Sequence, residues 1–233
     1  MTFNYAELNK IRDPDKFQVH ADLHTHTICS KDSTITPKDL VFYARKNGLN
    51  AVAVTDHNRV DCALKMTKET DFLIIPGIEV SSLHGHIIGL NLQEPVERGL
   101  SADETVEKIH GLGGIAIACH PFARFKGSVG KHVTGKFDAV EAINSSAFPF
   151  GGSTRKAHEL AERLKLPKTA GTDAHYGPVI GQAYTIINAE PDAESIVKAI
   201  VKGNCEPAGT SISWAMRLEN QTRLLRKSLK KRE

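Results

Sequence analysis

Two histidines separated by one residue, His24 and His26, are the clearest sign of chemistry in this sequence. They end the segment Asp22-Leu23-His24-Thr25-His26, and the apolar residues within 17–21 before it predict a strand. Alternate side chains of a strand point to the same side, so both imidazoles face one way. Two imidazoles held on a strand form half of a metal site. Taken alone, the pair is also explained by two hydrogen-bonded or exposed histidines.

Further metal-ligand side chains follow at the ends of other apolar runs. His86 is the exception because it lies where an apolar run begins. A catalytic zinc-type site uses three protein ligands, so a set this large implies two or three ions. The set has no thiolate, which suits Mn, Fe or Zn better than copper or an iron–sulfur cluster. Its members are His24, His26, Asp32, His57, Glu79, His86, His120, Asp173 and His175.

Alternating strands and helices must position these side chains. Thr36 and Pro37 predict the start of a helix that ends before Gly48, and Ser101 with Glu104 forms a capping box. Strand and helix alternate along most of the chain, which indicates a parallel sheet with crossover helices. An open sheet gathers ligands at one crevice, whereas a closed ring brings many strand ends together. We therefore expect a β/α barrel.

Composition limits the remaining possibilities. The chain has 233 residues, 40% hydrophobic and 24% charged, which fits one large soluble domain. No apolar run approaches the roughly 20 residues of a membrane span, and no secretory signal is evident. The four cysteines are scattered, so we expect reduced thiols and a cytoplasmic location.

Charge is unevenly distributed along the chain. Residues 214–233 carry seven Lys/Arg and two Glu, a net charge of +5 within a total of +3, so the preceding part is at −2. This balance disfavours a nucleic-acid-coating surface for the body. We expect residues 1–16 to form a short arm, 1–213 to contain the barrel, and 214–233 to form a basic helix or tail.

Six motifs in order resemble those of the polymerase-and-histidinol-phosphatase (PHP) domain family. They are Asp-Leu-His-Thr-His, Thr-Asp-His, Gly-Ile-Glu-Val, His-Ile-Ile-Gly, Cys-His-Pro and Gly-Thr-Asp-Ala-His. The match runs from about Val19 to Ile187. The resemblance implies a distorted seven-stranded (β/α) barrel with a trinuclear metal site, and mainly phosphoesterase activity. At this length the chain resembles the small stand-alone members.

The resemblance also implies how the ligands are divided among three ions. His24, His26, Glu79 and Asp173 would hold the first ion. Glu79 would bridge to a second ion, held also by His86 and His120, and Asp32, His57 and His175 would hold the third. The chain has Lys31-Asp32 after Ser30, where many relatives have Asp-Gly, so Asp32 is the weakest assignment. His84 competes with His86, because alternate strand residues face the same way.

Paired cations can share a water, lower its pKa and leave a hydroxide that attacks phosphorus. Glu79 and Asp173 would then take part in catalysis through the metals, and Cys119 would face away. Arg124, in a basic loop after His120, would hold the phosphate in two-point contact. Lys126, Lys131 and His132 are alternatives, and all four are also explained by an exposed basic loop. Asp22 and Asp56 would orient ligand imidazoles or cap local backbone.

The predicted function is a metal-dependent phosphoesterase that hydrolyses phosphate esters of small molecules, with nucleotides the favoured substrates. One alternative is a nuclease acting on the 5′ end of short oligonucleotides. Others are a histidinol phosphate phosphatase, a hydrolase of carbon–nitrogen bonds and a non-catalytic metal-binding module. We expect no membrane partner, and the sequence leaves the oligomeric state open.

Overall fold

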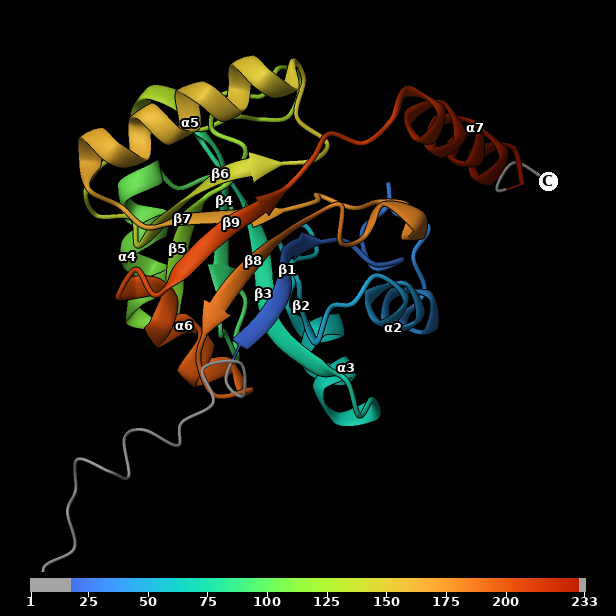
Figure 1. Cartoon of the computed structure of the whole chain (residues 1–233), viewed down its shortest axis with the longest axis horizontal. Helices are drawn as coiled ribbons and strands as arrows, with labels where there is room; N and C mark the ends of the chain where they lie inside the picture. Colours follow the sequence, from blue (N-terminus) through green and yellow to red (C-terminus); the bar gives the residue numbers. More distant parts are fainter. Residues whose placement is uncertain (1–17, 231–233) are drawn as a thin grey trace, which may run out of the picture.

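One curved sheet organises the protein. The computed structural model describes residues 18–230, and in this range the strand order is β7-β6-β5-β4-β3-β2-β1-β8-β9 (Figure 1). The strands are β1 (Gln18–Thr25), β2 (Ala51–Val54), β3 (Leu73–Ser82), β4 (Gly85–Leu90), β5 (Ile115–Ala118), β6 (Ala139–Asn144), β7 (Lys168–Gly171), β8 (Ala183–Asn188) and β9 (Cys205–Gly209). The expected arm over residues 1–16 and the last three residues of the tail lie outside the described range.

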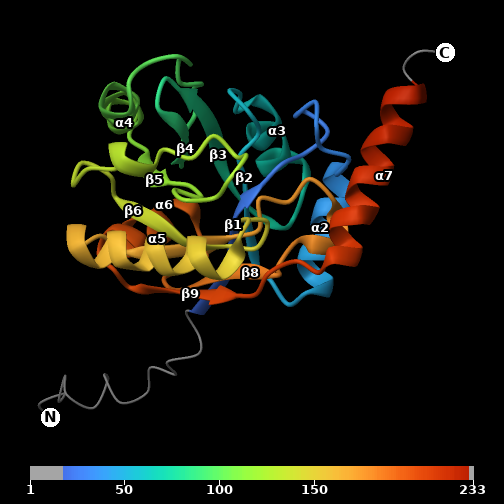
Figure 2. The same ribbon diagram turned by 90° about the horizontal axis from the view of Figure 1, so that it is seen from above.

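Helices lie around the strands, as the view from above shows (Figure 2). They are α2 (Pro37–Lys46), α3 (Asp61–Glu69), α4 (Ala102–Gly111), α5 (Phe150–Leu164), α6 (Ala193–Val201) and α7 (Trp214–Lys230), with short 3-10 turns η2 (Gly130–His132) and η3 (Gly177–Val179). Thr36 and Ser101 each cap a helix through a capping box, with Asp39 and Glu104 as partners. The predicted starts of these two helices are therefore confirmed.

The ring closes at the carboxyl ends of its strands. On one edge β1 pairs with β2, and on the other its first half pairs antiparallel with β8. Its last residues pair instead with the segment after β7, where the Asp173 amide donates to the His24 carbonyl at 2.8 Å. Strands β1 to β7 thus form a nearly closed barrel, which confirms the predicted class. The sheet has nine strands rather than seven, because β8 and β9 extend it outside this ring.

Strand β4 breaks the parallel order. It is antiparallel to both β3 and β5, whereas β1–β2–β3 and β5–β6–β7 are parallel runs. The predicted parallel sheet is therefore present as two parallel runs, whereas β4, β8 and β9 are antiparallel to their neighbours. Strand β4 reverses because the segment after Ser82 turns back as a hairpin. In an antiparallel strand the first residues lie beside the last residues of its neighbour. His86 pairs with Ser81, so the start of β4 lies at the same barrel end as the other candidate ligands.

Two apolar clusters hold the barrel together. Small and β-branched side chains such as Ala21, Ala53 and Ile75 fill the interior, and Ile196 and Ile200 of α6 join them. Strand β8 is antiparallel to β1 and leads directly into α6, so this helix lies at the end opposite the candidate ligands. The second cluster packs the outer helices on the sheet. Among the described residues, no helix is long and apolar enough to cross a membrane.

A disulfide corrects the expectation of four reduced cysteines. Cys29, in the loop after β1, is bonded to Cys62 at the start of α3, while Cys119 and Cys205 are free. The two bonded residues are 33 positions apart, with a Cα–Cα distance of 6.6 Å. The barrel brings them together by laying the β1 loop over α3. Two cysteines so far apart in the sequence have no spacing that indicates a disulfide, so the sequence pattern could not predict the Cys29–Cys62 bond.

Candidate metal centre

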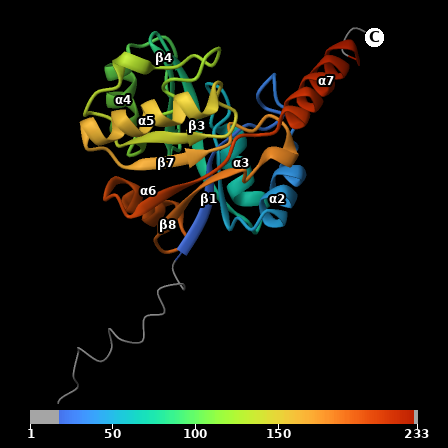
Figure 3. The same cartoon turned by 45° about the horizontal axis from the view of Figure 1, so that its top comes forward.

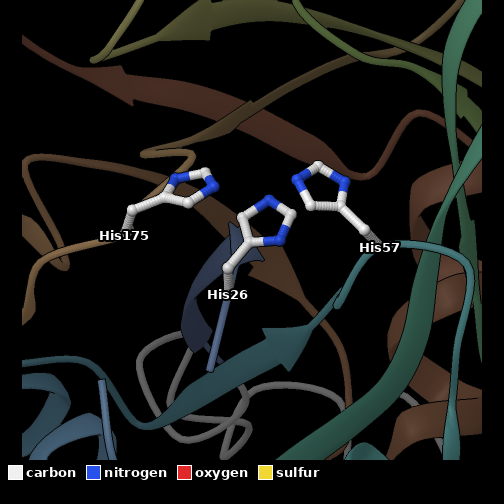
Figure 4. Close-up of side chains that lie close together, drawn as sticks. All are labelled: His26, His57 and His175. Atoms are coloured by element: carbon white, nitrogen blue, oxygen red, sulfur yellow. The ribbon is translucent and has the colours of Figure 1, made fainter. Parts of the chain in front are cut away.

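All nine predicted ligands lie at the carboxyl end of the barrel, where the strand ends converge. Figure 4 shows the imidazoles of His26, His57 and His175 directed toward one another. The ring centroid of His26 is 4.4 Å from that of His57 and 4.2 Å from that of His175. These rings come from the ends of different strands, so the barrel fold itself brings them together.

The four side chains predicted for a first ion form one buried group. His26 Nε2 lies 3.2 Å from Glu79 Oε2 and 3.3 Å from Asp173 Oδ1. His24 Nε2 lies 3.5 Å from Glu79 Oε1 and 3.6 Å from Asp173 Oδ1. Both imidazoles thus face the same two carboxylates, as the alternation along β1 predicts.

Glu79 is the common member of the first two groups. Its Oε1 lies 2.9 Å from His86 Nδ1 and 3.0 Å from His120 Nε2. His86 and His120, which are predicted to hold the second ion with Glu79, therefore both lie against the same oxygen of Glu79. Glu79 thus links the first and second groups. His84, the alternative to His86, lies outside this arrangement and stacks on His132 with ring centroids 3.9 Å apart.

The third predicted group lies at the mouth of the site. Asp32 Oδ2 is 3.4 Å from His57 Nε2 and 3.2 Å from His175 Nε2. Asp32 is 51% exposed, unlike the buried carboxylates of Glu79 and Asp173. His57 Nδ1 also lies 2.9 Å from Glu79 Oε2, so the third group is joined to the first two.

The donor atoms face one another in a way that suits metal ions. The Nε2 atoms of His24 and His26 are 3.2 Å apart, and such a pair can share only one proton. Glu79 Oε2 is buried without an oriented hydrogen bond, although imidazole nitrogens surround it. Several triplets offer ligand atoms within 4.8 Å of one another, including His24-His26-Glu79 and His57-Glu79-His86. Imidazole and carboxylate donors in this density fit divalent ions of the Mn, Fe or Zn type.

Charge is concentrated in the buried part of the site. Burial alone would raise the pKa of Glu79, but His24, His120 and their neighbours hold it well below its usual range. Burial would lower the pKa of His57, yet the carboxylates of Asp32 and Glu79 outweigh it and raise this pKa to about 10. The carboxylates of Asp32 and Glu79 are therefore held ionised, and the imidazoles of His24 and His57 hold their protons.

Backbone strain accompanies two of the ligands. His120 and Asp173, each two residues after the end of a strand, have φ values of 33° and 54°. Non-glycine residues seldom adopt this left-handed region, and such strain concentrates at functional sites. Both backbone amides donate hydrogen bonds that hold these conformations, the His120 amide to Glu141 Oε2 at 2.7 Å and the Asp173 amide to the His24 carbonyl at 2.8 Å.

Glu141 is a component that the sequence analysis missed. It is buried in the middle of β6, and its Oε1 lies 3.1 Å from His24 Nδ1. Its Oε2 accepts from the His120 amide and from Asn144 Nδ2 at 2.9 Å. A carboxylate behind a metal-binding imidazole fixes its ring and tautomer. A charged residue inside an apolar strand was the available signal.

Asp22 and Asp56 cap backbone rather than touch ligand imidazoles. Asp56 accepts from the amide and hydroxyl of Thr27 at 2.8 and 2.6 Å, and from Ser30 Oγ at 2.6 Å. Asp22 accepts from the amide of Thr172 at 2.9 Å. Each carboxylate therefore fixes a loop that carries ligands, which agrees with the capping alternative.

Lys126, and not Arg124, contacts the cluster. Its amino group pairs with Asp173, whereas the Arg124 side chain is exposed and does not line the cavity. The turn around Gly127 explains the difference. Gly127 has a φ of 62°, and a Cβ there would lie 2.9 Å from His86 Nε2, so the loop folds tightly onto the ligands at this point. The phosphate-holding role predicted for Arg124 finds no support in this arrangement.

Cys119 does not face away from the site, contrary to expectation. Its thiol lies 3.6 Å from Glu79 Oε1, inside the barrel. Burial and the nearby carboxylates of Glu79 and Glu141 raise the pKa of this thiol well above its usual value. A protonated thiol is a poor nucleophile, so Cys119 acts as a packing residue and weak hydrogen-bond donor.

Comparisons with known proteins agree with this fold and site. The family description "PHP domain" matches residues 22–117, and "PHP-associated" matches residues 151–205. An uncharacterized protein of Methanocaldococcus jannaschii is 37% identical over 139 residues, covering 54% of this chain and 81% of that protein. The 5'-3' exoribonuclease Rnm of Salmonella typhimurium is 30% identical over 152 residues, 51% of this chain and 52% of the relative.

A solved structure supports the fold independently. A two-domain protein from Bacteroides vulgatus, described as containing a predicted PHP-like metal-dependent phosphoesterase, superposes with a TM-score of 0.67. The identity is 17%, and the match covers 83% of this chain and 65% of the other. The barrel and its convergent imidazoles and carboxylates define a hydrolase acting on phosphoester bonds, with side chains that can hold divalent metal ions. The chain belongs to the PHP domain family.

Proposed function

We propose that this protein uses two or three divalent metal ions to hydrolyse phosphate esters of nucleotides. The observation that carries the proposal is the sharing of one buried carboxylate, Glu79, among five imidazoles that four strands, β1, β2, β4 and β5, bring together. Mn, Fe and Zn suit this donor set. When bound, such ions supply Lewis-acid activation of a water and neutralise charge on the phosphate.

The proposed ligand groups are those that the sequence predicts. His24, His26, Glu79 and Asp173 form the first, and Glu79 with His86 and His120 forms the second. Asp32, His57 and His175 form the third. The close contacts within each group support this assignment. The partial exposure of Asp32 supports a third group on the side from which substrate would enter.

The chain's own residues prepare the site for a phosphate. Lys126 lies against Asp173 at the cavity wall, so its ammonium group can donate to a non-bridging oxygen when substrate enters. Glu141 fixes His24, and Asp56 fixes the loop that carries His26 through Ser30. Ligands that are already held in place cost little reorganisation during the reaction.

A second candidate is hydrolysis at the 5′ end of short RNA or DNA. Relatives named 5'-3' exoribonuclease in Salmonella typhimurium and Escherichia coli favour it, although the chain spans only 52% and 29% of those proteins. Metal-loaded protein should be offered a mononucleotide and a 5′-phosphorylated oligonucleotide, with histidinol phosphate in the same panel. Phosphate release from the mononucleotide supports our proposal. Cleavage of the oligonucleotide alone would assign the nuclease activity instead.

Substitution of the first ligand pair tests the catalytic claim. The double variant His24→Ala, His26→Ala should lose metal content and phosphate release together. His110→Ala is a matched control, because His110 pairs with Asp138 on the surface. It should retain both properties. Phosphate release that persists in the double variant, after chelation of free metal, would overturn the proposal and favour a metal-binding module.

A further inference from the structure

A second cavity adjoins the candidate metal centre. The cavity that contains the ligands has a volume of about 230 Å³, below the roughly 300–1,000 Å³ of ordinary small-molecule sites. It has room for ions, water and a phosphate group, so the rest of a substrate must lie elsewhere. The neighbouring cavity measures about 520 Å³ and shares Lys126, Asp173 and His175 with it.

Exposed apolar side chains form the far wall of this second cavity. Phe148, in the loop before α5, is 41% exposed, while Trp214 and Leu218 of α7 are 73% and 64% exposed. The rings of Phe148 and Trp214 meet edge to face with centroids 6.1 Å apart. Exposed apolar groups gathered around one concavity are typical of a binding surface. Aromatic rings in such a wall favour a flat aromatic ligand.

Arg217 holds this wall against the barrel. Its guanidinium donates to the carbonyl oxygens of Ser146 at 3.1 Å and Ala147 at 3.2 Å. It also lies 5.8 Å from the centre of the Trp214 ring. Arg223, further along α7, lies 4.8 Å from the ring centre of Tyr176, and the far end of the helix projects from the body, as Figure 3 shows. The start of the helix is therefore fixed beside the metal centre, and the aromatic wall exists before a ligand arrives.

We propose that this second cavity binds the aromatic base of a nucleotide whose phosphate lies in the metal centre. The proposal rests on the function proposed above. Continuity with the metal centre through Lys126, Asp173 and His175 favours a substrate over a protein partner. Bases stack on aromatic side chains with little regard to sequence, so Trp214 and Phe148 recognise the base as a class. Arg217 acts as a positioning residue.

The fluorescence of Trp214 tests base binding without any need for turnover, because it is the only tryptophan of the chain. Adenosine, which carries no phosphate, should quench this fluorescence saturably, whereas ribose should not. Phe148→Ala should weaken the effect. Phe42→Ala is the matched control, since Phe42 is 58% exposed on α2 away from the cavity. It should bind adenosine as the wild type does.

Three results of the fluorescence experiment would overturn the proposal. One is the absence of quenching by adenosine. Another is equal affinity in Phe148→Ala and Phe42→Ala. The third is a spectral change that follows protein concentration without nucleoside, which would assign the wall to contact with a second copy of the chain.

Kinetic measurements on substrates with and without a base distinguish a loss of base binding from a loss of catalysis. For Trp214→Ala, kcat/KM for adenosine 5′-monophosphate should fall about 5- to 150-fold, the effect of one lost base stack. The value for ribose 5-phosphate, which has no base, should stay unchanged. An equal fall for both substrates, or no fall for either, would contradict the proposal. If neither substrate releases phosphate, the proposed function fails, and the fluorescence result still decides whether the base site exists.

Discussion

Replacing Glu141 by Gln probes the support behind the metal centre. The carboxylate serves three donors, the His24 ring at 3.1 Å, the His120 amide at 2.7 Å and the Asn144 side chain at 2.9 Å. A glutamine has only one oxygen and turns an NH2 group toward at least one of these donors. A buried donor that loses its acceptor costs about 1–3 kcal/mol. Loss of such an outer partner weakens metal binding by about 10- to 100-fold.

Competition with a coloured chelator measures the affinity directly. We expect Glu141→Gln to lose affinity by about that factor, equivalent to roughly 1.4–2.8 kcal/mol. Glu159→Gln is the control, because Glu159 is an exposed residue of α5 that pairs with Arg155. It should bind metal as the wild type does. Unchanged affinity in Glu141→Gln, or an equal loss in both variants, would refute the role given to Glu141.

Three further outcomes follow from the same geometry. The pKa of His57 is raised to about 10, so metal binding at pH 8 should release a proton from this imidazole and should weaken as the pH falls. The buffer takes up the released proton, so a calorimetric binding enthalpy that is the same in all buffers would contradict this. Lys126→Ala should lower kcat/KM about 10- to 100-fold, as expected for a lost hydrogen bond to a charged group, whereas Arg124→Ala should leave kcat/KM unchanged. A larger loss of kcat/KM in Arg124→Ala than in Lys126→Ala would support the role first predicted for Arg124. Reduction of the Cys29–Cys62 disulfide should lower the unfolding midpoint by about 4–16 °C, from about 2–4 kcal/mol at 2–4 °C per kcal/mol, and an unchanged midpoint in dithiothreitol would show that the bond does not constrain the fold.

The sequence predicted the barrel and the residues that gather at its carboxyl end, because ligands followed apolar runs at almost every strand end. It also included His86, because the residue precedes Ile-Ile-Gly as in the family motif, but it did not explain how a residue at a strand start lies beside the others. The reason is the hairpin that reverses β4, and a hairpin depends on turn geometry that the apolar pattern does not reveal. The predicted division of ligands among three ions stays a prediction.

Contacts between distant segments explain what the sequence could not give. In the sequence, Glu141 is one charged residue in a predicted strand, and only the folded structure shows that β6 places it behind His24. Arg124 and Lys126 are both basic residues of the same loop, so the sequence does not distinguish them. The tight turn at Gly127 brings Lys126, and not Arg124, against Asp173. The Cys29–Cys62 bond likewise depends on how the β1 loop crosses α3. In each case tertiary packing, and not local pattern, selects the partner.

Anomalous diffraction from crystals grown with Mn²⁺ tests the central claim most directly. We predict at least two peaks, about 3.5–4 Å apart, on either side of the Glu79 carboxylate. A single peak, or none within reach of His24, Glu79 and His120, would contradict a shared metal centre.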